Sequence, residues 1–179
     1  VDRMIELILQ SAARLQKDAT FDLEAHHEMA REAAREGIVL LKNKNHILPL
    51  QEGTKVALIG KMAEKIRYQG AGSSHINPTK LVQPKDVISH VAFAVGCDER
   101  GNTDENLLKE AEQAARTADV AVVFAGLTEV YESEGFDRKD MKMPKGHVRM
   151  IEAVSSANPN TIVVLMCGSA VECPWIDEV

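Results

Sequence analysis

The sequence predicts an α/β fold, in which a mostly parallel sheet is flanked by helices as a three-layer sandwich. Continuous apolar runs of strand length occur at residues 38–41, 56–60, 91–95, 120–125 and 161–166. Such runs, without alternation of polar residues, are typical of parallel strands that are covered on both faces. Helical patterns separate the later runs, and this order of strand, helix and strand implies right-handed crossovers.

The amino-terminal region is predicted to form two helices that precede the first strand. Apolar residues recur at helical spacing from Met4 onward. Asp22 is a candidate N-cap for a second helix over residues 22–36, since its side chain can accept hydrogen bonds from the first turn. We therefore divide the chain into residues 1–20, a terminal helix and linker, and residues 21–179, an α/β domain.

Two further helices are expected between the last three strands. A helix over residues 104–118 carries an apolar stripe, and either Thr103 or Asp104 can cap its first turn. A helix over residues 144–157 begins with Pro144, which suits a first helical position, and an Asn-Pro pair stops it. The predicted strands at 91–95 and 120–125 thus each lead into a helix that can cover the sheet.

Composition and charge restrict the class of protein. With 179 residues, 45% of them hydrophobic and 27% charged, the chain matches an ordinary globular protein with one sizeable core. Lys+Arg 21 against Asp+Glu 27 gives a net charge of −6, which argues against nucleic acid or an anionic membrane as the main partner. No segment approaches the roughly 18 consecutive apolar residues of a membrane span. We expect a small or neutral partner.

The cysteines and histidines do not form a metal-binding pattern. Cys97, Cys167 and Cys173 are odd in number and lack the partners of a zinc ligand set, so free thiols are expected. Free thiols favour a reducing compartment such as the cytoplasm, although a signal segment outside this chain would leave the compartment undetermined. His26 and His27 lie about 100° apart on a helix, which does not suit a shared metal ion. We expect no metal and no cofactor.

A glycine-rich segment at residues 70–74, Gly-Ala-Gly-Ser-Ser, is a candidate binding loop. It resembles the start of a dinucleotide-binding loop, but the third glycine is absent and the segment does not directly follow the strand at 56–60. Small residues still allow backbone amides and hydroxyls to approach a polar ligand. A plain turn explains the pattern equally well, so a nucleotide-binding domain is the last of our hypotheses.

An acidic segment follows the predicted strand at 120–125 and contains Glu132, Glu134, Asp137 and Arg138. In most proteins such a segment is a solvated loop. In open α/β sheets, however, ligands bind beyond the carboxyl ends of the strands, where this segment begins. Neighbouring carboxylates and aromatic rings are expected to raise the pKa of Glu134, as a general acid requires. Arg138 is expected to form a salt bridge with Asp137 that braces the loop.

Ordered motifs along the chain resemble those of a known family. They are H-H-E-M-A-R-E-A-A at 26–34, I-V-L-L-K-N at 38–43, I-L-P-L at 47–50, G-A-G-S-S at 70–74, E-S-E-G-F-D-R at 132–138, M-x-M-P at 141–144, N-P-N-T at 158–161 and G-S-A-V-E-C-P-W at 168–175. This order resembles the second domain of glycoside hydrolase family 3, the β-glucosidase and β-xylosidase family. The likeness covers nearly the whole chain.

The resemblance implies a domain of a retaining, exo-acting hydrolase of terminal β-glycosides. An aspartate nucleophile would lie in a preceding (β/α)8 barrel, Glu134 would be the general acid/base, and Ser73 would contact the sugar. Asp137 and Arg138 would support the loop. The expected partners are therefore a β-glycoside substrate and an N-terminal barrel domain, from which residues 1–20 would lead. Without that barrel, the isolated chain is expected to be inactive.

The last residues of the sequence predict an incomplete sheet. Residues 174–179 resemble the start of a further helix, so we expect a truncated sheet with an open edge and apolar surface. Self-association through that edge would follow.

The alternative function is a non-catalytic α/β domain that binds carbohydrate or protein. The third hypothesis is a nucleotide-binding domain, which depends on the glycine-rich segment at 70–74.

Overall fold

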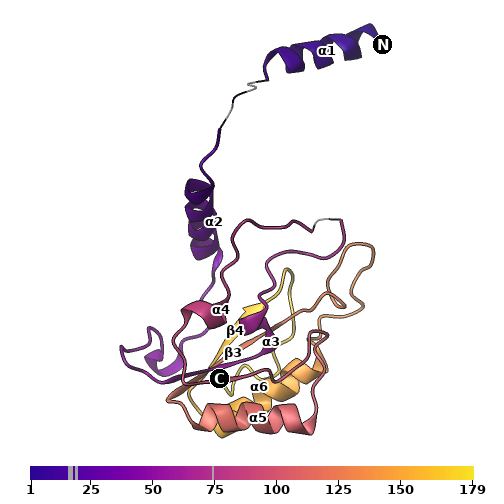
Figure 1. The fold of residues 1–179 in the computed structure, drawn as a ribbon. Helices are drawn as coiled ribbons and strands as arrows, with labels where there is room; N and C mark the ends of the chain where they lie inside the picture. Colours follow the sequence, from indigo (N-terminus) through magenta and orange to yellow (C-terminus); the bar gives the residue numbers. More distant parts are fainter. Residues whose placement is uncertain (16–17, 19, 74) are drawn as a thin grey trace. The chain divides into compact units, whose positions relative to one another are not determined.

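The chain divides into two units. The structure, a computed structural model, describes residues 1–15, 18, 20–73 and 75–179. Within this part the units are Val1–Leu41 and Lys42–Val179 (Figure 1). Their boundary follows residue 41, whereas the sequence predicts a division at residue 20. The linker predicted before that division includes residues 16, 17 and 19, which lie outside the described residues.

The first unit consists of two helices, α1 at Asp2–Ala13 and α2 at Leu23–Gly37. The predicted N-cap of α2 is confirmed, because Asp22 Oδ1 accepts hydrogen bonds from the amides of Glu24 at 2.9 Å and Ala25 at 3.1 Å. Neither helix buries a residue. The helical prediction for this region is therefore correct, and it rests on local signals.

The strand predicted at residues 38–41 is wrong. These residues are not part of the sheet, and their side chains are all at least 63% exposed. An apolar run becomes a strand only where a neighbouring backbone can accept and donate the ladder hydrogen bonds. The sequence shows the apolar run and does not show that the neighbour is missing.

The second unit contains the sheet and its covering helices. In chain order the elements are η1 Lys44–His46, β1 Val56–Ile59, α3 Lys61–Glu64, α4 Pro84–Val87, β2 Ala92–Ala94, α5 Glu105–Arg116, β3 Val120–Gly126, α6 Lys145–Ala157 and β4 Thr161–Met166. The four strands are parallel in the order β2-β1-β3-β4. The four later strand predictions and the parallel sheet are confirmed. The order reverses direction between β1 and β3, where α/β domains commonly bind ligands.

One face of the sheet is covered by α5 and α6, which lie side by side (Figure 1). Ile59 of β1 and Val123 of β3 pack there against Leu108 of α5 and against Ile151 and Val154 of α6. All five side chains are buried. The amphipathic stripes that predict the two helices therefore face the sheet.

The opposite face is covered by shorter pieces of chain. Leu58 of β1, together with Val122 and Phe124 of β3, packs against Met62 of α3 and against Leu50. Alternate residues of β1 and β3 thus enter two separate apolar clusters, as the pleat requires. The sheet has a covering layer on each face, so the predicted three-layer arrangement is confirmed.

A side-chain cap fixes where the covering helix α5 begins, whereas the N-cap residue of α6 makes no side-chain hydrogen bond. Asp104 caps α5 by accepting hydrogen bonds from the amides of Asn106 and Leu107, both at 2.9 Å. Thr103 instead donates to the carbonyl of Gly96 at 2.6 Å. Pro144, expected at the first helical position of α6, is its N-cap residue. The uncertainty between Thr103 and Asp104 is thereby resolved in favour of Asp104.

β4 is an edge strand in the described part of the chain. It pairs with β3 on one side, and Val164 is 36% exposed. Its outer backbone groups present the kind of open edge that a further strand can pair with. No helix among the described residues is long and apolar enough to cross a membrane.

Candidate active site

Three loops meet beyond the carboxyl ends of neighbouring parallel strands. We call residues 67–73, which follow β1 and α3, the glycine loop. Residues 127–138, which follow β3, are the acidic loop, and residues 167–172, which follow β4, are the C-terminal loop. Because the strands are parallel and adjacent, their carboxyl ends lie at one edge of the sheet. Hydrogen bonds between the loops, described below, hold this edge together.

Glu134 and Ser73, both predicted as site residues, are brought together at this edge. Glu134 Oε2 accepts hydrogen bonds from the Ser73 amide at 2.7 Å and from Ser73 Oγ at 2.5 Å. The Glu134 amide donates to the carbonyl of Ala71 at 3.4 Å. The Glu134 carboxylate of the acidic loop is therefore hydrogen-bonded to the glycine loop. Ser74, the last residue of the glycine-rich motif, lies outside the described residues.

Gly72 makes this close approach possible. Its φ is +88°, a value that favours glycine, and a Cβ there would lie 2.8 Å from Glu134 Oε2 and 2.9 Å from Glu134 Cβ. A side chain at this position would push the carboxylate away from Ser73. The glycine in the motif thus serves contact with the acidic loop, which explains its presence without a nucleotide phosphate.

The expected rise in the pKa of Glu134 is wrong for this chain. The hydroxyl and the amide of Ser73 both donate to the carboxylate and lower its pKa below the usual value. The apolar cover on which the expectation depended is missing, because Glu134 is exposed and Phe136 is 50% exposed. In this structure Glu134 is an ionised, solvent-facing carboxylate.

Replacing Ser73 by alanine is expected to raise the pKa of Glu134 toward its ordinary value. The substitution removes the hydroxyl donor and keeps the amide donor, so part of the shift should remain. Titration of the labelled Glu134 carboxyl carbon by NMR measures this in the isolated chain. Ser169→Ala is the matched control, because Ser169 donates to Glu132 and not to Glu134. An unchanged Glu134 pKa in Ser73→Ala would contradict the hydrogen bonding described here.

Glu132 is the most connected carboxylate of the acidic loop, and its partner Arg67 was not predicted. Arg67 Nη1 lies 2.5 Å from Glu132 Oε2, while Glu132 Oε1 accepts from the Gly168 amide at 3.1 Å and from Ser169 Oγ at 2.9 Å. Burial acts to raise the pKa of Glu132, but the hydrogen bonds from Arg67, Ser169 and Gly168 outweigh it and lower the pKa. Glu132 is therefore an ionised structural residue.

The predicted salt bridge between Asp137 and Arg138 is not found among the ion pairs of the described residues. Arg138 Nη2 instead donates to Ser169 Oγ at 3.0 Å and to the carbonyl of Ala170 at 2.7 Å. Asp137 is exposed, so water can solvate it. Both acceptors belong to the C-terminal loop and bind the same guanidinium nitrogen, and they replace the solvated Asp137 as partners of Arg138. Arg138 therefore holds the C-terminal loop, and Asp137 is not part of that contact.

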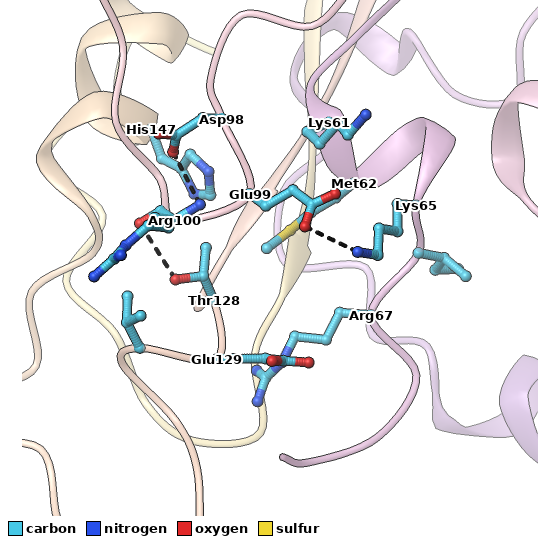
Figure 2. A pocket seen from close by; sticks show the side chains of 12 residues that line it. Lys61, Met62, Lys65, Arg67, Asp98, Glu99, Arg100, Thr128, Glu129 and His147 are labelled. Atoms are coloured by element: carbon cyan, nitrogen blue, oxygen red, sulfur yellow. Dashed lines mark hydrogen bonds and ion pairs between the residues drawn. The ribbon is translucent and has the colours of Figure 1, made fainter. Parts of the chain in front are cut away.

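A cavity of about 220 Å³ lies beside the glycine loop and the acidic loop, at the carboxyl ends of β1, β2 and β3 (Figure 2). Its lining includes Arg67, His147 and an ion pair between Lys65 and Glu99, with Lys65 Nζ 2.9 Å from Glu99 Oε2. His147 is buried, and its Nδ1 lies 2.9 Å from the carbonyl of Gly126; burial lowers its pKa. Arg67 of the glycine loop and residues 128–130 of the acidic loop thus line the cavity, and Glu134 does not.

The remaining histidine, cysteine and acidic side chains form no metal site and no reactive thiol in the described part of the chain. Within the described part of the chain, no three His, Cys, Asp or Glu side chains gather as a metal site. All three cysteines are free thiols. Burial raises the pKa of Cys97 to about 12 and also raises the pKa values of Cys167 and Cys173. These thiols are therefore poor nucleophiles near neutral pH.

The fold and this edge define a parallel α/β domain with an exposed carboxylate, Glu134, beyond the carboxyl ends of its strands. Residues 38–179 match the family described as the glycosyl hydrolase family 3 C-terminal domain. The chain belongs to this family. The resemblance stated from the sequence motifs is thereby confirmed.

Relatives and a solved structure agree with this membership. The chain is 45% identical to thermostable beta-glucosidase B of Acetivibrio thermocellus, over 100% of the chain and 25% of the relative. It is 42% identical to an exo-alpha-(1->6)-L-arabinopyranosidase of Bifidobacterium longum, over 96% of the chain and 25% of the relative. A crystal structure of a Bifidobacterium adolescentis GH3 beta-glucosidase superposes with a TM-score of 0.88 at 41% identity, covering 98% of this chain and 27% of that one. The chain thus spans about a quarter of the curated relatives' length.

Proposed function

We propose that this chain is the domain that supplies the general acid/base, Glu134, to a retaining exo-acting β-glycosidase. The observation that supports the proposal is the exposed Glu134 carboxylate, which is hydrogen-bonded to Ser73 at the carboxyl edge of the sheet, where α/β domains commonly bind ligands. The nucleophile would come from a barrel domain, which is the main proposed partner beside the β-glycoside itself. The open edge of β4 remains the expected route of self-association.

The proposed reaction has two steps. In the first, a carboxylate nucleophile attacks the anomeric carbon, the glycosidic C–O bond breaks, and Glu134 gives its proton to the leaving oxygen. In the second, Glu134 takes a proton from water as the water oxygen attacks the anomeric carbon and releases the nucleophile. One residue therefore acts as acid and then as base, and no cofactor is needed.

To act as a general acid in the complete enzyme, Glu134 needs a higher pKa than it has in this chain. A nucleophile carboxylate about 5 to 5.5 Å away would raise the pKa of Glu134 by like-charge repulsion. Exclusion of water by the docked domain would raise it further. If Ser73 turns its hydroxyl to a sugar hydroxyl, as we propose, Glu134 also loses a donor that lowers its pKa. Each of these changes favours the protonated acid needed for the first step.

A hybrid enzyme tests the proposal. Residues 1–179 replace the matching quarter of the Acetivibrio thermocellus β-glucosidase, and both the hybrid and the isolated chain are assayed on p-nitrophenyl β-glucoside. We expect hydrolysis by the hybrid and none by the isolated chain, which holds half of the carboxylate pair. A folded, inactive hybrid contradicts the proposal. Tight binding of glucose or xylose by the isolated chain, measured by calorimetry, would favour the non-catalytic alternative instead.

A further inference from the structure

Arg67 is held in one orientation by oxygen atoms of the acidic loop. Its Nη1 donates to the carbonyl of Leu127 at 2.9 Å and to Glu132 Oε2, and its Nη2 donates to the carbonyl of Glu132 at 2.7 Å. The side chains of Arg67 and Glu132 are only 15% and 23% exposed. Leu127, the residue directly after β3, is fully buried. A guanidinium with these partners fixes both the position and the direction of the loop.

Glu132 also binds the C-terminal loop. Its Oε1 accepts from the Gly168 amide and from Ser169 Oγ. A Cβ at Gly168 would lie 3.1 Å from Glu132 Oε1, so the absence of a side chain at Gly168 makes room for the Glu132 carboxylate. One partly buried carboxylate therefore joins all three loops, and Arg67 balances its charge.

The glycine loop and the acidic loop are consequently bridged at two points. Arg67 and Ser73 lie at the two ends of the glycine loop, and their partners Glu132 and Glu134 are two residues apart in the acidic loop. The Ser73 bridge is exposed, and the Arg67 bridge is largely buried. The buried bridge is less accessible to competing water, so we take it as the fixed point from which Glu134 is placed.

We infer that Arg67 is a positioning residue for the acid/base, acting through Glu132 on the place of Glu134. The inference rests on the proposed function. Loss of the guanidinium would leave the charge of Glu132 partly buried and without its cation, which favours movement of the loop toward water. Glu134, two residues further on, would move with it. A displacement of about 1 Å at a reacting group can cost on the order of 10²-fold in rate.

The test is Arg67→Met in the hybrid enzyme, assayed with two leaving groups. Phenyl β-glucoside needs protonation of its leaving oxygen, whereas 2,4-dinitrophenyl β-glucoside needs little. Arg67→Met is expected to lower kcat/KM for the phenyl substrate by about 10- to 100-fold, and for the dinitrophenyl substrate by far less. Arg67→Lys should fall between, because lysine keeps the charge without the two-nitrogen fork. A role in stability alone would reduce the active fraction, and hence both rates, by one common factor.

Controls separate this inference from the proposed function. Arg149→Met removes another ion pair, in which Arg149 Nη2 lies 2.7 Å from Glu105 Oε1 on the α5 and α6 side, and should not change the ratio of the two rates. Glu134→Gln must show the leaving-group dependence; if it does not, the proposed function fails. If Glu134→Gln shows it and Arg67→Met lowers both rates equally, only the positioning role is overturned.

A second variant covers the case in which Arg67→Met does not fold. Glu132→Gln keeps the shape of the side chain and removes its charge, so a smaller change of the same kind is expected. Because this variant weakens the same bridge from the other partner, a preferential loss on the phenyl substrate supports the inference. An equal loss on both substrates contradicts it.

Discussion

Replacing Glu134 by glutamine in the hybrid enzyme is expected to lower kcat/KM for phenyl β-glucoside by about 10²- to 10⁴-fold, the usual contribution of general acid catalysis. Glutamine has nearly the shape of glutamate and can still accept hydrogen bonds from Ser73. It cannot give a proton to the leaving oxygen at a useful rate. The substitution therefore removes the chemistry while it keeps the contacts of the loop.

The leaving group decides whether this loss has the proposed cause. A 2,4-dinitrophenolate departs without protonation, so kcat/KM for that glucoside should change little in Glu134→Gln. Its kcat should fall, because the second step still needs a base to activate water. The matched control is Asp137→Asn, which neutralises an exposed carboxylate of the same loop and should leave both substrates unaffected. Equal losses of kcat/KM on both substrates would remove Glu134 from the acid role.

Leu58→Ala is expected to destabilise the second unit by about 2 to 5 kcal/mol, the cost of a large-to-small change in a packed core. Leu58 lies in β1, is fully buried and packs between β3 and α3. Such a loss is a large part of the roughly 5 to 15 kcal/mol that holds a typical domain folded. Urea denaturation of the isolated chain, followed by circular dichroism, measures the change in the free energy of unfolding.

Leu81→Ala provides the control for this measurement. Leu81 belongs to the same unit, outside any helix or strand, and is 42% exposed. The same substitution should therefore lower the free energy of unfolding by about 1 kcal/mol or less, because the exposed Leu81 side chain buries less apolar surface on folding than Leu58 does. If the two variants lost stability equally, the core around β1 would not be the one described.

Much of the fold was predictable because its signals are local. The runs at β1, β2, β3 and β4 are apolar and unbroken, as buried parallel strands require. Asp22 and Asp104 were predictable as caps because a carboxylate directly before a helical pattern has backbone amides within reach. The run at residues 38–41 has the same local character, yet whether it pairs depends on a neighbour that the pattern cannot show.

The site was predictable in its residues and less so in its contacts. The motifs single out Glu134 and Ser73, and the structure adds the hydrogen bonds between them, which reverse the expected direction of the Glu134 pKa shift. Arg67 and Glu132 are 65 residues apart, so no spacing rule connects them. One signal was available: several carboxylates crowd one short loop, and a buried member needs a cation. The sequence offers many cations and does not say which one.

The measurement that tests the central claim most directly is the capture of the glycosyl-enzyme intermediate by azide. In Glu134→Ala of the hybrid enzyme, no residue is left to deprotonate water, whereas azide attacks the anomeric carbon without needing a base. We predict that azide accelerates the variant on 2,4-dinitrophenyl β-glucoside and that the product is β-glucosyl azide. The hybrid with Glu134 intact should gain no rate from azide. Turnover of the variant in water at the rate of the unsubstituted hybrid, with no glucosyl azide formed, would contradict the claim.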